Sequence, residues 1–296
     1  MTDIVSEKAY AKLNLTLDIT GVRSDGYHLL KSVMQTIDLH DDIILERKSS
    51  GVSLELVCEG NEASGHDTIP AGDDNLVCRA AKLMLEKTGA GGVAIRLVKR
   101  IPAAAGMGGG SADAAAVLRG MNELFELKLS DSELCGAGVK LGADVPFCIM
   151  GGTRLCEGIG EEMTGLKRLE GISLVYVKPA VDVPTAKIYR MYDETGAPAG
   201  HPDNDGICRL IERGGVTAEK LGGYLGNVFE PLAISLHPEI GKIKDALLQT
   251  GAAAALMTGS GPTVFALYAD AAKASEAAET IRRSMGTVYA GWATMV

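Results

Sequence analysis

Residues 12–19 alternate between polar and apolar side chains, which predicts a β-strand with one buried face. Successive side chains of a strand point to opposite faces, so Lys12 and Asn14 would share the polar face and could both reach one ligand. On spacing alone, a polar strand face of this kind is more often simply solvated. The apolar positions are Leu13, Leu15, Leu17 and Ile19.

The rest of the chain mixes strand patterns with helix patterns and has no regular alternation of the two. Strands are predicted at residues 43–47, 52–57, 93–99, 173–177 and 287–292, with two more flanking residues 259–262. Helices are predicted at residues 75–87 with Asp74 as N-cap, from near Ser111 to Phe125, at 130–142, from Pro184, at 238–251 and at 271–283. This mixture favours the α+β class. A break in the pattern near residues 152–160 divides the chain into domains at 1–155 and 156–296.

Composition and charge narrow the classes of function. A net charge of −9 over 296 residues disfavours nucleic acid as a partner, because the phosphates would be repelled. No apolar run reaches the roughly 18 residues of a membrane span, and the N-terminus lacks the features of a secretory signal, so we expect a cytoplasmic protein with no membrane partner. The cysteines form no CxxC pair and are expected to be reduced core residues; they stand at positions 58, 78, 135, 148, 156 and 208.

A glycine-rich segment between a predicted strand and a predicted helix is the strongest single signal of function. Glycines let a backbone approach a ligand closely, and N–H groups at a helix N-terminus attract anions, so this loop is typical of a phosphate-binding site. It matches neither the GxxxxGK[ST] pattern nor GxGxxG, and the alternative is a flexible loop before a helix. The candidate residues are Pro102, Gly106, Met107, Gly108, Gly109, Gly110, Ser111 and Ala112.

Three further features carry weaker signals. Asp144 lies in an apolar stretch, where it could act as a base or orient a hydroxyl, or could simply cap a turn before Pro146. Tyr27 and His28 could stack on a planar base and hydrogen-bond its edge, although such a pair is more often just a strand start. The glycine-rich turn at residues 257–262 is either a hairpin or a backbone that meets a ligand. The other histidines show no metal-ligand spacing.

Taken jointly, these motifs resemble the GHMP family of small-molecule kinases, and the resemblance covers nearly the whole chain. The Arg-x-Asp-Gly-Tyr-His portion separates the member with a cytidine diphosphate-linked substrate from its relatives. The motifs are Ala11–Leu17, Arg23–Leu29, Pro102–Ala115, Leu141–Pro146 and Gly259–Thr263, with Asp74–Leu76, Pro184–Thr185 and Tyr189 also fitting.

The resemblance implies a reaction and its catalytic residues. The γ-phosphoryl group of ATP would pass to the 2-hydroxyl of a cytidine diphosphate-linked methylerythritol, in the non-mevalonate isoprenoid precursor pathway. Asp144 would accept or orient the hydroxyl proton, and Lys12 would stabilise negative charge. Most of the catalysis would come from positioning and electrostatics, since phosphoryl transfer has a loose transition state.

The resemblance also implies binding residues and a fold. The loop at residues 106–111 would hold the ATP phosphates, with Asn75 and Lys99 near the adenosine. Mg²⁺ would accompany ATP, but Ala112 stands where many members carry a hydroxyl residue, and no acid can be named as the ligand of the ion. The expected fold is a ribosomal-S5-like N-terminal domain and a ferredoxin-like C-terminal domain with the site between them. On the substrate side, Tyr27 and Tyr189 would sandwich the cytosine, His28 would hydrogen-bond it, and Asn14 and Thr185 would also contact the substrate.

Two alternatives stay open at this point. Another GHMP kinase would act on mevalonate, homoserine or a sugar, but those substrates have no base for Tyr27 and His28 to contact. A nucleotide-binding regulator without turnover would have no use for Asp144 beside Lys12. An RNA-binding module is remote, because the chain is acidic and has no basic aromatic patch. The oligomeric state is not predicted.

Overall fold

A long central strand organises the N-terminal half of the molecule. The computed structural model describes residues 3–61, 64–197, 200–286 and 288–296. Within them, β3 (His28–Lys48) runs for 21 residues and pairs with four other strands of one sheet. These are β1 (Ile4–Asn14), β2 (Thr16–Val22), β5 (Gly92–Lys99) and β6 (Thr153–Glu157). The sheet is completed by β4 (Val52–Cys58) on β5, β7 (Glu162–Gly165) on β6 and β9 (Gly226–Asn227) on β2.

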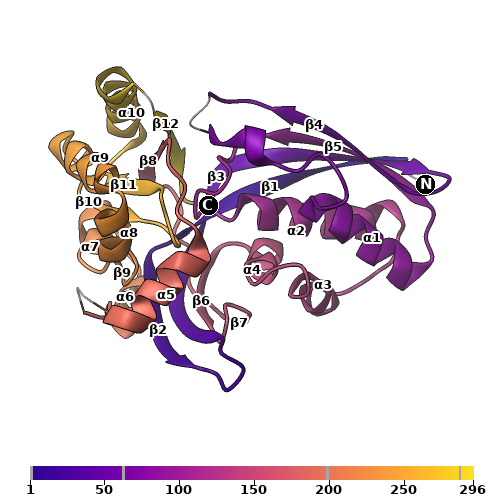
Figure 1. Cartoon of the computed structure of the whole chain (residues 1–296), viewed down its shortest axis with the longest axis horizontal. Helices are drawn as coiled ribbons and strands as arrows, with labels where there is room; N and C mark the ends of the chain where they lie inside the picture. Colours follow the sequence, from indigo (N-terminus) through magenta and orange to yellow (C-terminus); the bar gives the residue numbers. More distant parts are fainter. Residues whose placement is uncertain (1–2, 62–63, 198–199, 287) are drawn as a thin grey trace.

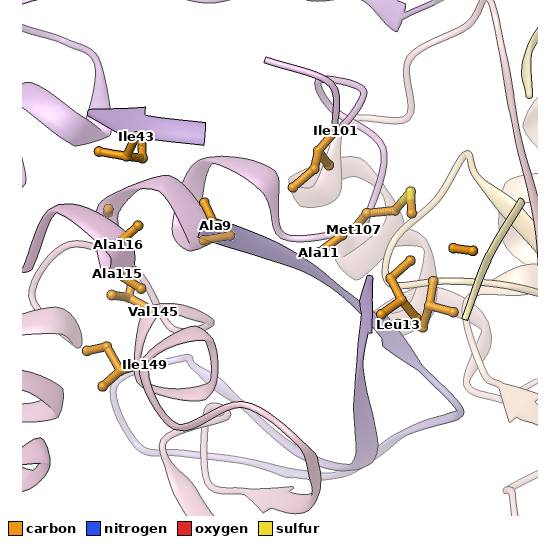
Figure 2. Close-up of a cluster of buried hydrophobic side chains, with 14 of the residues drawn as sticks. Ala9, Ala11, Leu13, Ile43, Ile101, Met107, Ala115, Ala116, Val145 and Ile149 are labelled. Carbon is orange, nitrogen blue, oxygen red and sulfur yellow. The ribbon is translucent and has the colours of Figure 1, made fainter. Parts of the chain in front are cut away.

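Four helices cover one face of this sheet (Figure 1). They are α1 (Leu76–Thr88), α2 (Gly109–Leu124), α3 (Asp131–Gly138) and α4 (Val145–Met150), and a short 3₁₀ helix at His66–Thr68 precedes α1. The alanines of α2 let it lie close to the sheet, and Figure 2 shows Ala115 and Ala116 in one cluster with Ala9 of β1. A Cβ on Gly120 would stand 2.6 Å from Leu45, so this helix position has no room for a side chain.

The C-terminal half has its own sheet of four antiparallel strands in the order β10-β11-β8-β12. The strands are β8 (Ser173–Pro179), β10 (Ala254–Met257), β11 (Val264–Tyr268) and β12 (Val288–Thr294), with α9 (Pro238–Gln249) before β10 and α10 (Ala271–Met285) before β12. This chain order and strand order form the split βαβ arrangement of ferredoxin-like domains. The segment between β8 and α9 holds α5 (Thr185–Thr195), α6 (Asn204–Arg213), α7 (Ala218–Gly222) and α8 (Glu230–Leu236).

The predicted α+β class is confirmed, and the described residues contain two separate sheets. The expected boundary at 155/156 falls inside β6, and both β6 and β7 pair within the N-terminal sheet. The first sheet thus includes β7 up to Gly165 and, later in the chain, β9 at Gly226–Asn227, while the second sheet begins at Ser173.

The strand predicted at residues 12–19 differs from expectation in two ways. It is divided at Leu15 into β1 and β2, and its polar face is not solvated: Lys12 is 4% exposed and Asn14 is 0% exposed. The reason is tertiary, since Thr258 from the C-terminal half and Asn204 of α6 hydrogen-bond to this segment. A pattern within one strand cannot reveal a cover that comes from so far along the chain.

Several local predictions also need correction. The N-cap of α1 is Asn75 rather than Asp74, because the Asn75 side chain accepts from the Val77 N–H. Helix α2 begins at Gly109, and α3 ends at Gly138 rather than at residue 142. Each of the six cysteines, all of them within the described residues, is a thiol rather than half of a disulfide, as expected, but Cys58 is exposed at the end of β4 rather than in the core. Across the described residues, every helix is too short or too polar to cross a lipid bilayer.

Candidate active site

Two cavities lie on opposite sides of the glycine-rich loop. The first, of about 550 Å³, lies between the two halves of the molecule, and the second, of about 420 Å³, lies between the loop and the start of α1. Both are lined by Ala104, Gly106, Gly108 and Ser111, so the loop is their common wall. Ligands bound on the two sides would therefore meet at the end of this loop.

The loop leads directly into the N-terminus of α2. Gly108 is the N-cap, has a φ of +71°, and offers no side chain to the first N–H groups of the helix. N–H groups without a side-chain cap at a helix start are suited to bind an anion. Gly106 has a φ of +72°, and a Cβ there would lie 2.3 Å from the Thr258 carbonyl oxygen. Glycine is required at Gly106 by both conformation and space.

The second glycine-rich turn braces the first. A Cβ on Gly259 would stand 2.9 Å from the Gly106 carbonyl oxygen, so the two backbones are in direct contact. The Thr258 hydroxyl accepts from the Asn14 N–H at 3.0 Å and donates to the Gly106 carbonyl at 3.4 Å. The turn at residues 257–262 thus joins β1 to the glycine-rich loop. Its sequence pattern alone left open whether it is a hairpin or a backbone that meets a ligand.

Lys12 and Asp144 form an ion pair at the wall of the first cavity. The Lys12 Nζ lies 3.2 Å from Asp144 Oδ2 and donates to Asn14 Oδ1 at 2.6 Å. Asp144 stands at the N-cap position of α4, but its side chain makes no capping hydrogen bond there, and 31% of that side chain is exposed. The Asp144 carboxylate therefore pairs with Lys12 at the wall of the cavity and does not cap its own helix.

Aromatic and hydroxyl groups line the far end of the first cavity. Thr185 Oγ1 lies 2.8 Å from Ser260 Oγ, and both residues line the cavity with Tyr189 and Phe229. The Tyr189 ring lies 4.8 Å from that of Phe229 and 4.8 Å from that of His28. Burial raises the pKa of Tyr189 to about 12, and the negative charge of Asp144 adds to the shift. The Tyr189 hydroxyl is therefore neutral and serves as packing surface.

The structure separates Tyr27 from the other predicted base-binding residues. His28 Nε2 lies 2.6 Å from Asp193 Oδ1, and the His28 ring packs on Tyr189. Tyr27 is 61% exposed on the turn before β3, with the Arg23 guanidinium 5.9 Å from its ring centre. Neither Tyr27 nor His28 belongs to the lining of the first cavity. The two tyrosine rings do not face each other across that cavity here.

The second cavity contains a buried charge network around Lys99. Lys99 is 3% exposed, and its ammonium contacts Asp41 and, at 2.7 Å, Asp113 Oδ2. Burial alone lowers the pKa of Lys99, but the two carboxylates outweigh it and raise that pKa above its usual value. Burial and the nearby Asp41 charge raise the pKa of Asp113. Asp41 also accepts from the Ile101 N–H at 2.8 Å, so the network ties β3, β5 and α2 together at the base of the loop.

Of the remaining residues predicted to bind nucleotide, some line the second cavity and others are buried in the core. Asn75 lines the second cavity, and its Nδ2 donates to the Pro70 carbonyl at 2.7 Å. Met107 is 1% exposed and packs in the core, as Figure 2 shows, and its carbonyl accepts from the Lys12 N–H at 3.0 Å. Ala112 is likewise buried within α2. Pro102, Gly109, Gly110 and Ser111 line the second cavity.

The chain belongs to the GHMP kinase family. It matches the GHMP kinases N terminal domain over residues 75–152 and the GHMP kinases C terminal domain over residues 201–287. The predicted family, fold and class of small-molecule kinase are thereby confirmed, and ATP use follows from the family.

Similar proteins carry a more specific name. The chain is 42% identical over 281 residues to the 4-diphosphocytidyl-2-C-methyl-D-erythritol kinase of Acetivibrio thermocellus, covering 95% of each chain. It is also 42% identical over 282 residues to the kinase of the same name from Pelotomaculum thermopropionicum, again covering 95% of each. A solved 4-(cytidine 5'-diphospho)-2C-methyl-D-erythritol kinase matches with a TM-score of 0.81 at 32% identity, over 98% of this chain and 99% of that one. A homoserine kinase from Cytophaga hutchinsonii shares the fold at 19% identity and a TM-score of 0.75.

The Lys99 network yields a prediction about stability. Replacing Lys99 by methionine leaves two carboxyl groups buried without their cation, and we expect a loss of about 3–5 kcal/mol in the free energy of unfolding. Urea unfolding followed by circular dichroism measures it. The control is Lys82→Met, which removes the exposed ion pair with Asp73 and should cost no more than about 1 kcal/mol. Equal losses in the two variants would contradict the structural role of the network.

Proposed function

We propose that this protein transfers the γ-phosphoryl group of ATP to the 2-hydroxyl of 4-diphosphocytidyl-2-C-methyl-D-erythritol, in the non-mevalonate isoprenoid precursor pathway. The observation that carries the proposal is the Lys12–Asp144 pair, 3.2 Å apart, at a cavity that shares its glycine-rich wall with a second one. Relatives at 42% identity bear the name of that activity. We take the first cavity as the substrate site and the second as the ATP site.

Asp144 and Lys12 divide the chemistry between them. The Asp144 carboxylate accepts or orients the proton of the substrate hydroxyl, whose oxygen then attacks the γ-phosphorus as the bond to the ADP oxygen breaks. The Lys12 ammonium stabilises negative charge on the attacking oxygen and on the transferred phosphoryl group. Because the transition state is loose, the site contributes mainly by holding the two reactants in line.

The loop and the start of α2 hold the ATP phosphates in this proposal. The backbone N–H groups from Gly106 to Ser111 supply hydrogen bonds, and the helix terminus supplies partial positive charge. Asn75 and Lys99 flank the adenosine end of the second cavity, where their side chains are already fixed by protein partners. They therefore shape the pocket more than they reach into it.

Mg²⁺ fits this site as an ion that arrives with ATP. Among the described residues, no group of three or more His, Cys, Asp or Glu side chains could hold a metal. Mg²⁺ usually takes only one or two protein oxygens and completes its shell with phosphates and water. The Ser111 hydroxyl, at the first cavity, is such a donor. When bound, the ion would neutralise phosphate charge during transfer.

The cytidine end of the substrate is assigned to Tyr27, His28, Thr185 and Tyr189. Tyr189 offers a fixed aromatic surface at the first cavity, and Tyr27, next to His28 in the chain, offers an exposed ring whose burial on the base would be favourable. In this proposal, the turn that carries Tyr27 closes over the cytosine when the substrate binds.

We also propose that the protein has no nucleic-acid partner and works in the cytoplasm. The net charge of −9 supports the absence of a nucleic-acid partner, and six cysteines held as thiols rather than as disulfides support a reducing compartment such as the cytoplasm.

The activity is tested by measuring ADP release from Mg·ATP by the purified protein. The cytidyl substrate is compared with mevalonate, homoserine and galactose at equal concentrations. We expect turnover with the cytidyl substrate alone. Turnover with one of the others instead would discard the cytosine assignment, and absence of turnover with all of them would favour a non-catalytic regulator.

Asp144→Asn tests the role of the carboxylate. The amide keeps the shape of the side chain but cannot take a proton, so we expect kcat to fall by about 10²–10⁴ while ATP still binds. Steady-state kinetics and ATP titration by calorimetry measure the two effects. Asp245→Asn, on the exposed side of α9, is the matched control. A kcat close to that of the unmodified protein would remove Asp144 from the base role.

Tyr27→Ala tests the stacking role without disturbing the core, because the ring is 61% exposed. Stacking of a base on an aromatic ring contributes about 1–3 kcal/mol, so we expect the KM for the cytidyl substrate to rise by roughly 5- to 150-fold with kcat little changed. Tyr10→Ala, at a surface tyrosine that packs on His40, is the control. An unchanged KM in Tyr27→Ala would end the stacking assignment.

A further inference from the structure

A chain of buried hydrogen bonds runs back from the Lys12 ammonium into the sheet. Lys12 Nζ donates to Asn14 Oδ1 at 2.6 Å, Asn14 Nδ2 donates to Ser32 Oγ at 2.8 Å, and Ser32 Oγ donates to the Thr16 carbonyl at 2.5 Å. Asn14, Thr16 and Ser32 are all 0% exposed. Water therefore does not compete for any of these three links.

The order of donors and acceptors along this chain is fixed from its far end. A carbonyl oxygen only accepts, so the single hydrogen of Ser32 goes to Thr16. The Ser32 oxygen must then accept from Asn14, which requires the NH₂ group of the amide to face Ser32. The amide oxygen is left facing Lys12, the one arrangement in which it can accept from an ammonium. Ser32 thus determines which end of Asn14 meets the lysine.

The neighbouring Thr16 side chain holds this far end in place. Its hydroxyl donates to Asn204 Oδ1 at 2.6 Å and accepts from the Val33 N–H at 2.9 Å. Thr16 is thereby fixed to β3 on one side and to α6 of the C-terminal half on the other. The carbonyl that receives the Ser32 hydrogen belongs to a residue with little freedom to move.

We propose that Ser32 is a positioning residue for phosphoryl transfer, acting on Lys12 through the orientation of Asn14. An ammonium has three N–H donors. Asn14 and Asp144 take two of them, which leaves the third for the transferred phosphoryl group. Asn14 then acts on the lysine rather than as a direct substrate contact. This inference rests on the proposed kinase function, because it assigns a catalytic task to the Lys12 ammonium.

The first test compares kcat and KM for Ser32→Ala and Ser32→Cys. Without the Ser32 hydroxyl the Asn14 NH₂ group loses its acceptor, so the amide is no longer held in one position against Lys12. We expect kcat to fall at least about 10-fold in both variants, since small displacements of catalytic groups reduce rates strongly, with each KM within about 2-fold. Ser32→Thr keeps the hydroxyl and should retain most of the activity. The control is Ser173→Ala, which removes another buried serine hydroxyl, in β8.

A double-mutant cycle separates positioning from general damage to the fold. In a Lys12→Met background, Ser32→Ala should lower the residual kcat by less than about 2-fold, because the residue through which Ser32 acts is already gone. A full second loss there would overturn the proposal, as would undiminished kcat in both Ser32→Ala and Ser32→Cys. Ser32→Cys changes the volume least, so it decides the point if the alanine variant does not fold.

A measurement that needs no activity tests the same geometry. The side-chain amide hydrogens of Asn14, followed by nuclear magnetic resonance, should exchange with solvent at least about 10-fold faster in Ser32→Cys than in the unmodified protein. Equal exchange rates would overturn the orienting role of Ser32. If the unmodified protein phosphorylated no substrate, the proposed function would fail, but this exchange experiment would still decide whether Ser32 fixes Asn14.

Discussion

The nearly dry environment of the Lys12 ammonium is the constraint on which the site depends. A lysine that is 4% exposed must find acceptors within the protein, since burial of an unpaired charge is costly. Asn14 and Asp144 supply them from β1 and from the start of α4. The stem of Lys12 also needs room, and a Cβ on Gly108 would lie 2.9 Å from Lys12 Cγ. Glycine at position 108 therefore leaves room for the lysine side chain beneath the loop.

The same constraint couples the two halves of the molecule. The turn that covers β1 is held from below by Asn227, whose Nδ2 donates to the carbonyls of Met257 and Gly259 at 2.8 Å each. Glu230 accepts from the Met257 N–H at 2.9 Å. Through these bonds the position of the glycine-rich loop depends on β9 and α8, although neither element reaches the second cavity. The wall between the cavities is thus built from both halves.

The sequence allowed local features to be predicted wherever the signal lies within one segment. The glycine-rich loop and its place before a helix belong to this kind, and the structure contains both. Burial of the Lys12 face, the Asp41 contact with Lys99 and the link through Ser32 could not be predicted. Each of these three features joins residues that meet only because distant strands pair. The alternation of side chains within one strand does not indicate which other segment packs on that strand.

Two buried lysines show why burial alone does not identify a catalytic cation. Lys99 lies between two carboxylates, so its charge is fully compensated and its ammonium serves the fold. Lys12 has one carboxylate and one neutral amide, and the carboxylate is 31% exposed to the cavity. A neutral acceptor orients an ammonium without cancelling its charge, so Lys12 is compensated by one carboxylate where Lys99 has two. In the proposed mechanism, the kind of acceptor, rather than the depth of burial, therefore distinguishes Lys12 from Lys99, the lysine that holds the structure together.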